Sequence, residues 1–446
     1  MPYFIIICVA LLVSAASAHA GTLSLSLRDA ITLALDNNNQ IKAARFNSQA
    51  AGQGIKSVNS RYMPLIALEE ALVASNSPTS TFMMKLDEGR FTQNDFQISN
   101  LNNPGASHDF KTAVTIQQPL YVPSLSPLKE LAVKDAQKSE LELEAVRQGI
   151  SLQVFYSYLE VQKAAARITA ADKAVTDARE NLRLATVRTA SGVGLKSDEL
   201  RSRTNLSQVE QQQISAGNNL TLARMKLAQL AGLPEESAFE ITGFTGFAEI
   251  PPLTEQSMKG ALEQRTEILQ ARTDLEKSAA ALSLARSGYL PTVGAFASYQ
   301  VNAKDAPFTS DNDSWNAGIS LKWNLFDGFR RGSESQQALS RQSAAREMLE
   351  STTKEVRYQM KESHLRRAEA GKRREVADHA VLDAEETVRL LAKRYENSLA
   401  TMVELLDAQT ALNQARITLV DAEADYAAAG GRIYYMAGTF VKEMVK

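Results

Sequence analysis

A run of apolar residues at strict seven-residue intervals is the feature that most constrains this chain. Val154, Val161, Ile168, Val175 and Leu182 occupy the successive positions. A strict heptad repeat keeps one stripe of a helix facing a partner and imposes a supercoil. The surrounding sequence, from residue 128 to about 190, predicts one helix of roughly 90 Å at 1.5 Å per residue. Such a helix is far longer than a globular domain needs.

A second pair of apolar seams lies near the C-terminal end, on either side of a short polar segment. This segment, Glu396-Asn397-Ser398, favours a turn or a helix cap over a helix interior. We therefore expect a long helix over about 332–395, a tip at about 396–401 and a return helix over about 402–428. The seam residues are Val381, Ala384, Val388, Leu391 and Tyr395 before the turn, and Met402, Leu405, Leu412 and Leu419 after it.

The first half of the chain carries the same arrangement, with a tip at about 191–198 and a return helix at about 199–230. Tyr62-Met-Pro64 recurs as Tyr289-Leu-Pro291, 227 residues later, and Gly192 matches Asn397, 205 residues later. Two structural repeats therefore share one order of elements: helix, strand, loop, strand, long helix, tip and return helix. We place the first repeat at 21–232, an equatorial linker or short strand at 233–253, the second repeat at 254–438 and a C-terminal tail at 439–446.

Two pairs of amphipathic strands are expected between the helices. Trp315, Ala317, Ile319, Leu321 and Trp323 alternate with small or polar residues, which is the period of a strand with one apolar face. No apolar run beyond the first twenty residues has the length of a membrane helix, so any membrane span must consist of such strands. Four strands cannot close a barrel, and open strand edges are not tolerated in lipid, so several copies must combine. The expected strands are 65–75, 110–118, 292–301 and 314–325, and the polar segment 76–109 is expected to be a loop.

Residues 1–20 have the pattern of a secretory signal peptide. An apolar core from Phe4 to Val13 precedes Ala18-His19-Ala20, which fits the small-x-small pattern of a cleavage site. We place the cleavage after Ala20. The alternative is an uncleaved membrane anchor, which the short apolar run disfavours. Cys8 is the only cysteine, so the mature, exported chain would contain none.

Charge and motifs argue against nucleic-acid binding and against enzymatic chemistry. The formal net charge is −2, which offers no basic surface to a nucleic acid. The sequence has no nucleophile elbow, phosphate loop or pair of catalytic carboxylates. His364 and His379 lie fifteen residues apart on one expected helix, and this spacing does not suit a shared metal. We expect no enzyme, no cofactor and no metal site.

A set of short motifs follows the duplicated plan along the chain. They are the tips Gly192–Asp198 and Tyr395–Ala408, the Tyr-x-Pro helix exits at 62–64 and 289–291, Trp323-Asn-Leu-Phe-Asp-Gly328, and the endings Leu230-Ala-Gly232 and Met436-Ala-Gly438. In this order they resemble the outer-membrane efflux proteins of the TolC type, the exit ducts of tripartite efflux pumps and type I secretion systems. The resemblance covers essentially the whole mature chain.

The resemblance implies a mainly α fold with a membrane β-barrel, located in the outer membrane of a Gram-negative cell and extending into the periplasm. Each protomer of a homotrimer would give four strands to a twelve-stranded barrel and its long coiled helices to a periplasmic α-barrel, with a small mixed α/β equatorial belt. The implied partners are outer-membrane lipid, a periplasmic adaptor (membrane fusion) protein and an inner-membrane pump driven by protons or by ATP.

The resemblance also implies a gate at the periplasmic mouth, formed by the second tip. Glu404 and Asp407, three residues apart on one helix face, match carboxylates that narrow this mouth, and Tyr395 matches a tyrosine that ties the tip shut. Three copies would place six carboxylates around one axis, and such rings select for cations. Ala400 stands in the place of the family's arginine, and the candidates to replace that arginine are Lys393, Arg394 and Arg188.

Both tips match the surface that meets the adaptor in this family. Asn397 stands where the family usually has glycine. The residues that match the adaptor contact are Gly192, Val193, Gly194, Leu195, Ser197, Asp198, Leu399, Ala400 and Thr401.

The alternative reading of the heptads is a periplasmic or surface coiled coil, similar to an adhesin, without a pore. Heptad seams alone more often indicate a dimeric coil than a tube. An amphipathic strand pair repeated between the helices distinguishes the two, because a fibrous coil has no use for the segment 315–323.

Overall fold

A computed structural model describes residues 23–234, 237–244, 246–247 and 250–445, so the expected signal peptide at 1–20 lies outside the described residues. The protein is mostly helical, with few strands. It divides into two compact units. The first takes the described residues of Met1–Asn39, Gln148–Leu253 and Lys361–Lys446, and the second takes Gln40–Arg147 and Thr254–Met360.

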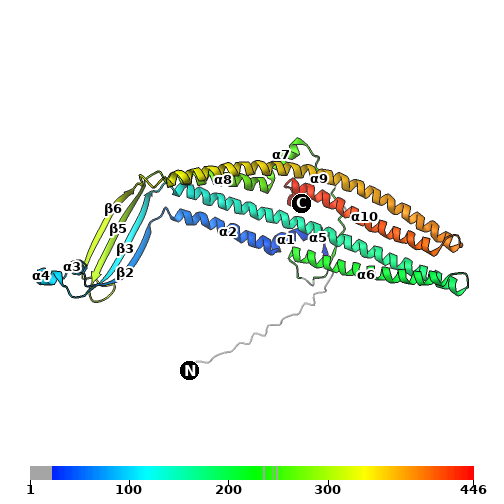
Figure 1. Cartoon of the computed structure of the whole chain (residues 1–446), viewed down its shortest axis with the longest axis horizontal. Coiled ribbons are helices and arrows are strands. Elements are labelled where there is room, and N and C mark those ends of the chain that lie inside the picture. Colours follow the sequence, from blue (N-terminus) through cyan, green and yellow to red (C-terminus); the bar gives the residue numbers. More distant parts are fainter. Residues whose placement is uncertain (1–22, 235–236, 245, 248–249, 446) are drawn as a thin grey trace, which may run out of the picture. The chain divides into compact units, whose positions relative to one another are not determined.

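The second unit contains a four-stranded antiparallel sheet in the order β2-β3-β5-β6 (Figure 1). In its register Leu68 lies opposite Val114, Val114 opposite Tyr299, and Tyr299 opposite Trp315. Directly opposed residues share a face, so one face of the sheet carries an apolar row. These side chains are exposed, with Trp315 at 77%. The strands are β2 (Leu65–Ser75), β3 (Ser107–Tyr121), β5 (Thr292–Ala303) and β6 (Asn312–Lys322).

The strands differ from expectation mainly at their ends. β2 has the expected bounds, whereas β3 and β5 extend beyond theirs. The expected end of the last strand at residue 325 is wrong, because β6 ends at Lys322. Just beyond it, the indole Nε1 of Trp323 donates a hydrogen bond to the backbone carbonyl of Tyr289 at 3.1 Å. Trp323 thus ties the end of the strand to the chain that leads into β5.

The polar segment between β2 and β3 is not the loop that we expected. It contains α3 (Pro78–Asp87), the 3-10 helix η1 (Gln93–Phe96) and α4 (Ile98–Asn102). Pro78 stands at the start of α3, where its missing N–H costs nothing. Phe82, Phe91 and Phe96 pack edge to face, with ring centroids 4.6 to 6.3 Å apart. This aromatic cluster gives the segment a small core.

Two very long helices, α5 (Leu125–Ala190) and α9 (Arg330–Glu396), run through both units. Within the second unit, ion pairs join α5 to α8 (Thr266–Ser287): Lys138 lies 2.8 Å from Asp274, and Lys134 lies 2.8 Å from Glu276. The remaining helices of this unit are α2 (Asn39–Ser60), which begins at the boundary between the units, and α7 (Glu255–Gln264). No helix among the described residues is both long and apolar enough to cross a membrane.

An apolar stripe from Leu27 to Ala44 predicts a helix from Ser26 to about Tyr62, but in the structure this helix is broken in two. α1 (Leu27–Asn37) ends before Asn38, and α2 starts after it. The Asn38 side chain is buried and its Nδ2 donates to the carbonyl of Leu230 at 3.0 Å. Asparagine competes well for backbone partners in this way, which explains why the apolar stripe does not continue as one helix.

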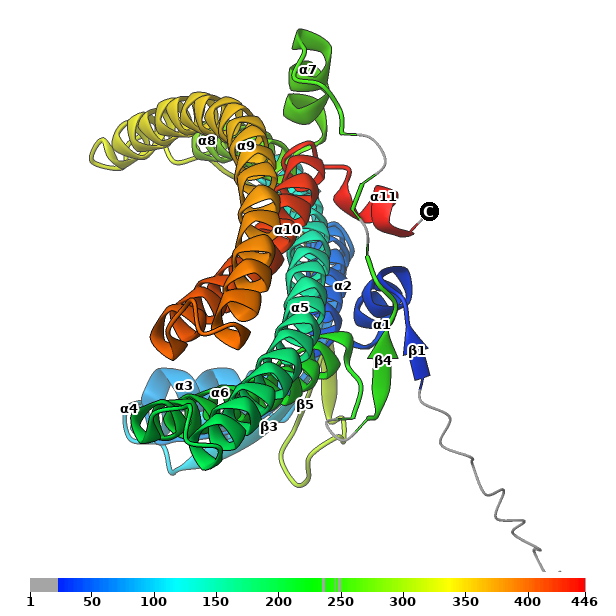
Figure 2. The ribbon, with the colours of Figure 1, turned by 90° about the vertical axis from the view of Figure 1, so that its right-hand side faces the viewer.

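The first unit is organised around the seam of α5. Val154, Val161 and Val175 of the heptad are at most 2% exposed. Short strands β1 (Leu23–Leu25) and β4 (Phe239–Ile241) pair in parallel and lie beside α1 (Figure 2). The Tyr158 hydroxyl of α5 donates to the carbonyl of Leu25 at 3.0 Å and also contacts the carbonyl of Thr242. The other helices here are α6 (Lys196–Ala231), α10 (Met402–Met436) and α11 (Phe440–Val445).

The C-terminal end is more ordered than expected. α10 continues to Met436, beyond the expected end near residue 428, and the expected tail contains α11. Phe440 of α11 is fully buried, and its ring lies 5.6 Å from that of Phe155. Burial of this aromatic side chain is what holds α11 in place.

Candidate functional site: the paired helix tips

The two tips have the same construction, and both belong to the first unit (Figure 1). α5 ends at Ala190 and α6 begins at Lys196. α9 ends at Glu396 and α10 begins at Met402. Each turn therefore consists of five residues between two helices. The two repeats predicted from the sequence thus have turns of the same length.

The first turn wraps closely around the last residues of α5. The backbone N–H groups of Val193 and Gly194 donate to the carbonyl of Arg188 at 3.1 and 2.8 Å. Gly192 has a φ of 78°, in the left-handed region. A Cβ at Gly194 would lie 2.9 Å from backbone atoms of Arg188 and Thr189, so only glycine fits this approach.

The second turn repeats this geometry with a one-residue shift from the sequence match. Ser398 has a φ of 58°, and the N–H of Leu399 donates to the carbonyl of Arg394 at 2.7 Å. The structural counterpart of Gly192 is therefore Ser398, so the expected match to Asn397 is wrong. Asn397 is still helical in its bonding, because its N–H donates to the carbonyl of Lys393. A left-handed backbone costs a residue with a Cβ about 1–2 kcal/mol.

The carboxylate of Glu404 closes a capping box at the start of α10. Its Oε2 accepts hydrogen bonds from the backbone N–H of Thr401 at 2.7 Å and from the Thr401 hydroxyl at 2.9 Å. In return the Thr401 Oγ1 accepts from the N–H of Glu404 at 3.3 Å. The backbone hydrogen bond from Thr401 is the main cause that lowers the pKa of Glu404. Glu404 thus remains ionised and exposed while it caps the helix.

Asp407 lies one turn further along α10, and its side chain is exposed like that of Glu404. Residues three apart on a helix share a face. The structure therefore brings the two predicted gate carboxylates together on the surface of α10, directly after the second tip.

Tyr395, the third predicted gate residue, is buried beneath the second tip. It is 4% exposed and packs in one apolar cluster with Met402 and Leu405 of α10 and Ala185 of α5. Burial is the main cause that raises the pKa of Tyr395. Its hydroxyl has no hydrogen-bond partner among the described residues, so the ring contributes packing to the tip.

Arg188 of α5 joins the first tip to the second. Its Nη1 donates to the carbonyls of Tyr395 and Glu396 at 3.0 and 3.2 Å, and its Nη2 donates to the Ser398 hydroxyl at 2.8 Å. The guanidinium carbon lies 4.8 Å from the Tyr395 ring centroid. A cation at the C-terminal end of a helix is also favoured by the helix dipole.

Helices α5 and α6 form one hairpin with the first turn, and α9 and α10 form the other with the second turn. Of the three candidates to replace the family's arginine, only Arg188 links these two hairpins. Arg394 donates to the carbonyl of Leu399 at 3.2 Å within its own turn. The backbone carbonyl of Lys393 accepts from the Asn397 side chain at 2.8 Å, and its ammonium group forms no ion pair within 4 Å in the described parts of the chain. The only sequence signal for Arg188 is its position four residues before the glycine of the first turn. This position does not predict that Arg188 contacts the second turn.

The predicted adaptor-contact residues lie on the two turns and at the start of α6, and three of them, all apolar, form an exposed crown. The side chains of Val193, Leu195 and Leu399 are 69%, 66% and 67% exposed. Exposed apolar groups of this size often mark an interaction surface. Of the other predicted contact residues, Gly192, Ser197 and Thr401 are exposed, and Gly194, Asp198 and Ala400 are half-buried.

No metal centre is found within the described ranges, since no group of three or more His, Cys, Asp or Glu side chains there could hold an ion. His364 is engaged with the carbonyl of Pro251 at 3.0 Å.

The comparisons with known proteins agree with this architecture. The alkaline protease secretion protein AprF of Pseudomonas aeruginosa is 23% identical over 424 residues, which cover 93% of this chain and 85% of AprF. The outer membrane protein TolC of Vibrio cholerae is 24% identical over 428 residues, 92% of this chain and 91% of TolC. The crystal structure of the outer membrane protein VceC from Vibrio cholerae matches with a TM-score of 0.75 at 19% identity, over 92% of this chain and 96% of VceC. A family model described as outer membrane efflux protein matches residues 30–233 and 258–439, and the chain therefore belongs to the outer membrane efflux protein family.

Proposed function

We propose that this outer membrane efflux protein is a passive, homotrimeric exit duct of a tripartite efflux pump or a type I secretion system. Cargo would pass from the periplasm through the helical part of the trimer and leave through a barrel in the outer membrane. The protein is a channel and not an enzyme, so energy must come from an inner-membrane pump.

The observation that carries this proposal is the sheet of the second unit. Its edge strands β2 and β6 each have a strand neighbour on one side only among the described residues, and one face exposes Leu68, Tyr299 and Trp315. Lipid accepts such a face, but it does not accept open edges. Three copies joined edge to edge, β6 of one to β2 of the next, would give a closed barrel of twelve strands. A pore-free coil has no role for these exposed strands, so we set that alternative aside.

The size of the assembly tests this proposal directly. Purified mature protein in detergent is expected to have the mass of a trimer by light scattering and to migrate as a heat-sensitive trimer on a gel. Replacing Ile319, which is 73% exposed on β6, with arginine places a charge on the lipid face and should reduce insertion. Ser320→Arg, on the opposite face of the same strand, is the matched control. A monomeric rod that stays in water would refute the proposal.

The gate of the duct would lie at the second tip. Glu404 and Asp407 of three copies would form a ring of six carboxylates that favours cations and repels anions. Arg188, acting through Tyr395 and Ser398, would hold this tip against the first one while the duct is closed. The support for this proposal is the exposed pair of carboxylates and the Arg188 side chain, which extends from the end of α5 to the second turn.

Conductance in planar bilayers tests the gate. Glu404→Gln together with Asp407→Asn removes two charges per chain, while the introduced glutamine can still close the capping box. We expect reduced cation selectivity and weaker block by divalent cations. Asp425→Asn, on α10 but paired with Arg373 at 3.6 Å, is the control for loss of a carboxylate elsewhere on the same helix. Unchanged selectivity in the double variant would exclude the carboxylate ring.

The exposed crown of Val193, Leu195 and Leu399 is proposed as the surface for a periplasmic adaptor protein. Apolar side chains that are two-thirds exposed lose contact with water when a partner covers them. Replacing all three with serine should abolish co-purification of a periplasmic adaptor protein but leave the trimer intact. Retained co-purification would place the adaptor elsewhere.

A further inference from the structure

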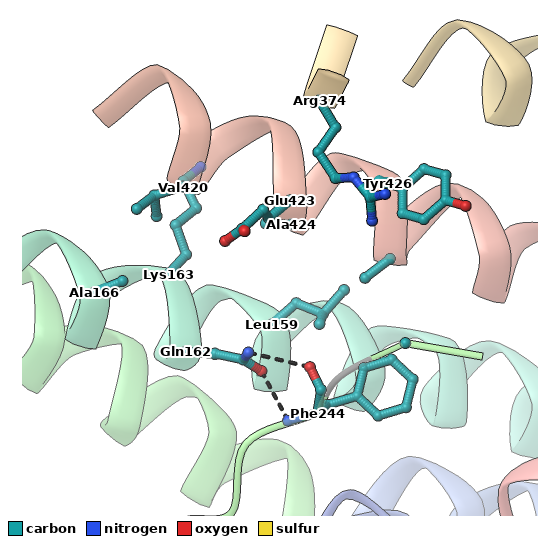
Figure 3. Close-up of a pocket in the computed structure, with 12 residues that line it drawn as sticks. Leu159, Gln162, Lys163, Ala166, Phe244, Arg374, Val420, Glu423, Ala424 and Tyr426 are labelled. Atoms are coloured by element: carbon teal, nitrogen blue, oxygen red, sulfur yellow. Dashed lines mark hydrogen bonds between the residues drawn. The ribbon is translucent and has the colours of Figure 1, made fainter. Parts of the chain in front are cut away.

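A pocket of about 320 Å³ lies in the first unit, away from the tips, between α5, α9, α10 and the segment after β4 (Figure 3). Leu159 and Lys163 of α5 line one side, and Arg374 of α9 and Tyr426 of α10 line another. Phe244 closes it from the segment after β4. None of these residues is part of the proposed duct gate.

Two arginines lie against the ring of Tyr426. The guanidinium carbons of Arg367 and Arg374 lie 3.2 and 4.5 Å from its centroid. The two arginines are seven residues apart on α9 and so share one helix face. Arg367 also donates to the backbone carbonyl of Tyr426. Stacking on an aromatic face leaves the edge of a guanidinium, with its N–H donors, available to an oxyanion.

Neither arginine has a carboxylate partner in the described parts of the chain, although most neighbouring charges are paired. Arg373 pairs with Asp425 at 3.6 Å, and Lys163 contacts Asp421 at 3.4 Å. Burial, and also the positive charge of Arg374, lowers the pKa of Arg367. Two close cations repel one another, so the arrangement favours a negative group bound at Arg374.

The walls of the pocket are held by their own contacts. The Gln162 amide donates to the carbonyl of Phe244 and accepts from its N–H, both at 3.1 Å (Figure 3). The Phe244 ring packs against Phe155 and Phe247 at 5.7 and 5.3 Å. The amide of Gln162 is thus occupied, and the polar groups left for a ligand are the guanidinium of Arg374 and the carboxylate of Glu423.

Glu423 decides what kind of anion fits. It lines the same pocket and is exposed, without an ion pair among the described residues, and its side chain points from α10 toward the α5 side of the pocket (Figure 3). This carboxylate repels a doubly charged phosphate more than a single carboxylate. It can also accept a hydrogen bond from an ammonium group on the same ligand.

We propose that this pocket binds an amino acid or a short peptide, with its carboxylate on Arg374 and its ammonium group on Glu423. The site lies outside the conduit function and would recognise a zwitterionic peptide in the periplasm.

Calorimetric titration of the full-length protein in detergent, at low salt, tests this site with four probes. They are alanyl-alanine, N-acetyl-alanyl-alanine, alanyl-alanine amide and inorganic phosphate. We expect one alanyl-alanine to bind per chain, the acetylated form to bind more weakly and the amide not to bind. Phosphate binding equal to or tighter than that of alanyl-alanine would overturn the peptide assignment. No binding of any probe would overturn the site itself.

Variants assign the two ends of the ligand. Arg374→Gln should weaken alanyl-alanine at least about tenfold, the loss expected for one charge-assisted contact. Arg373→Gln removes a neighbouring arginine that does not line the pocket and should leave binding unchanged. Glu423→Gln should erase the preference for the free amine over the acetylated form. If Arg374→Gln unfolds the protein, Arg374→Lys keeps the charge but not the planar fork and should still weaken binding. Equal binding by Arg374→Lys, Arg374→Gln and the parent protein would refute the proposal.

Discussion

Arg188 and Tyr395 meet across the two hairpins in a contact that uses the backbone and ring of Tyr395 but not its hydroxyl. The guanidinium group donates to the Tyr395 carbonyl at 3.0 Å and lies 4.8 Å from the ring centroid. The contact therefore depends on the cation and on an aromatic ring. It does not depend on a phenol.

This geometry separates two substitutions at the tip. Arg188→Gln removes the charge that holds two carbonyls and the Ser398 hydroxyl, interactions of about 1.5–3 kcal/mol each for a charged donor. We expect the time that a single channel spends open in planar bilayers to rise at least about tenfold. Tyr395→Phe keeps the ring and every acceptor, and we expect it to conduct like the parent. A large effect of Tyr395→Phe with none of Arg188→Gln would reverse the assignment.

The capping role of Glu404 predicts a dependence of the second tip on pH. The folded-state pKa of Glu404 lies below its ordinary value, so its stabilising effect is complete above about pH 4.3, the unperturbed value. This effect is lost as the pH falls through the lower, folded pKa. Hydrogen exchange of the first amides of α10 should therefore accelerate, relative to its intrinsic rate, only as the pH falls below this unperturbed value.

Two substitutions isolate the cap from the charge. Glu404→Gln retains an acceptor for Thr401 and should show slow exchange without the acid-dependent step. Glu404→Ala removes the acceptor and should exchange faster at every pH. If Glu404→Ala and the parent protein exchange alike near neutral pH, Glu404 does not cap α10.

Periodicity predicted the long helices well, because a heptad seam such as Val154 to Leu182 depends on local spacing alone. The strands could also be predicted, because apolar and polar residues around Trp315 alternate with a period of two, which is the period of a strand and not of a helix. The helices between β2 and β3 were missed, because the mutual packing of Phe82, Phe91 and Phe96 depends on contacts that polar composition hides. The turn was misaligned by one residue, because a serine in a left-handed backbone gives no sequence signal of the kind that a glycine gives.

The sequence predicted which residues belong to the candidate site, but not the hydrogen bonds that join the two tips. Glu404 and Asp407 could be placed on one face from their spacing. The capping box between Glu404 and Thr401 has its own sequence signal, the Thr-x-x-Glu pattern. The contact between Arg188 and the second tip could not be derived, because it joins residues about two hundred positions apart.

The close approach at Gly194 predicts a strong local effect of a single methyl group. A Cβ there would lie 2.9 Å from the Arg188 backbone, so Gly194→Ala should push the turn outward at a cost of about 1–3 kcal/mol. We expect weaker binding of the adaptor and faster hydrogen exchange of residues 191–195. Gly217→Ala, inside α6 with open space around the new methyl group, is the control and should stabilise by about 0.5–1 kcal/mol. Equal behaviour of the two variants would contradict the tight turn.

The hydroxyl of Tyr158 gives the last prediction. Tyr158 is fully buried. Its hydroxyl contacts the carbonyl of Leu25, the last residue of β1, and the carbonyl of Thr242, the residue directly after β4. Tyr158→Phe keeps the ring but removes one donor from the carbonyl of Leu25, which still accepts from the N–H of Thr242 at 3.1 Å, so it should lower the free energy of unfolding of the first unit by about 0.5–1.5 kcal/mol. Tyr156→Phe makes the same chemical change at a hydroxyl without a partner in the described residues and should stay within about 0.5 kcal/mol. Hydrogen exchange of the β1 and β4 amides measures both. If Tyr158→Phe leaves that exchange unchanged, the strand pair is held by its own ladder and by the aromatic cluster, and the hydroxyl contributes nothing to it.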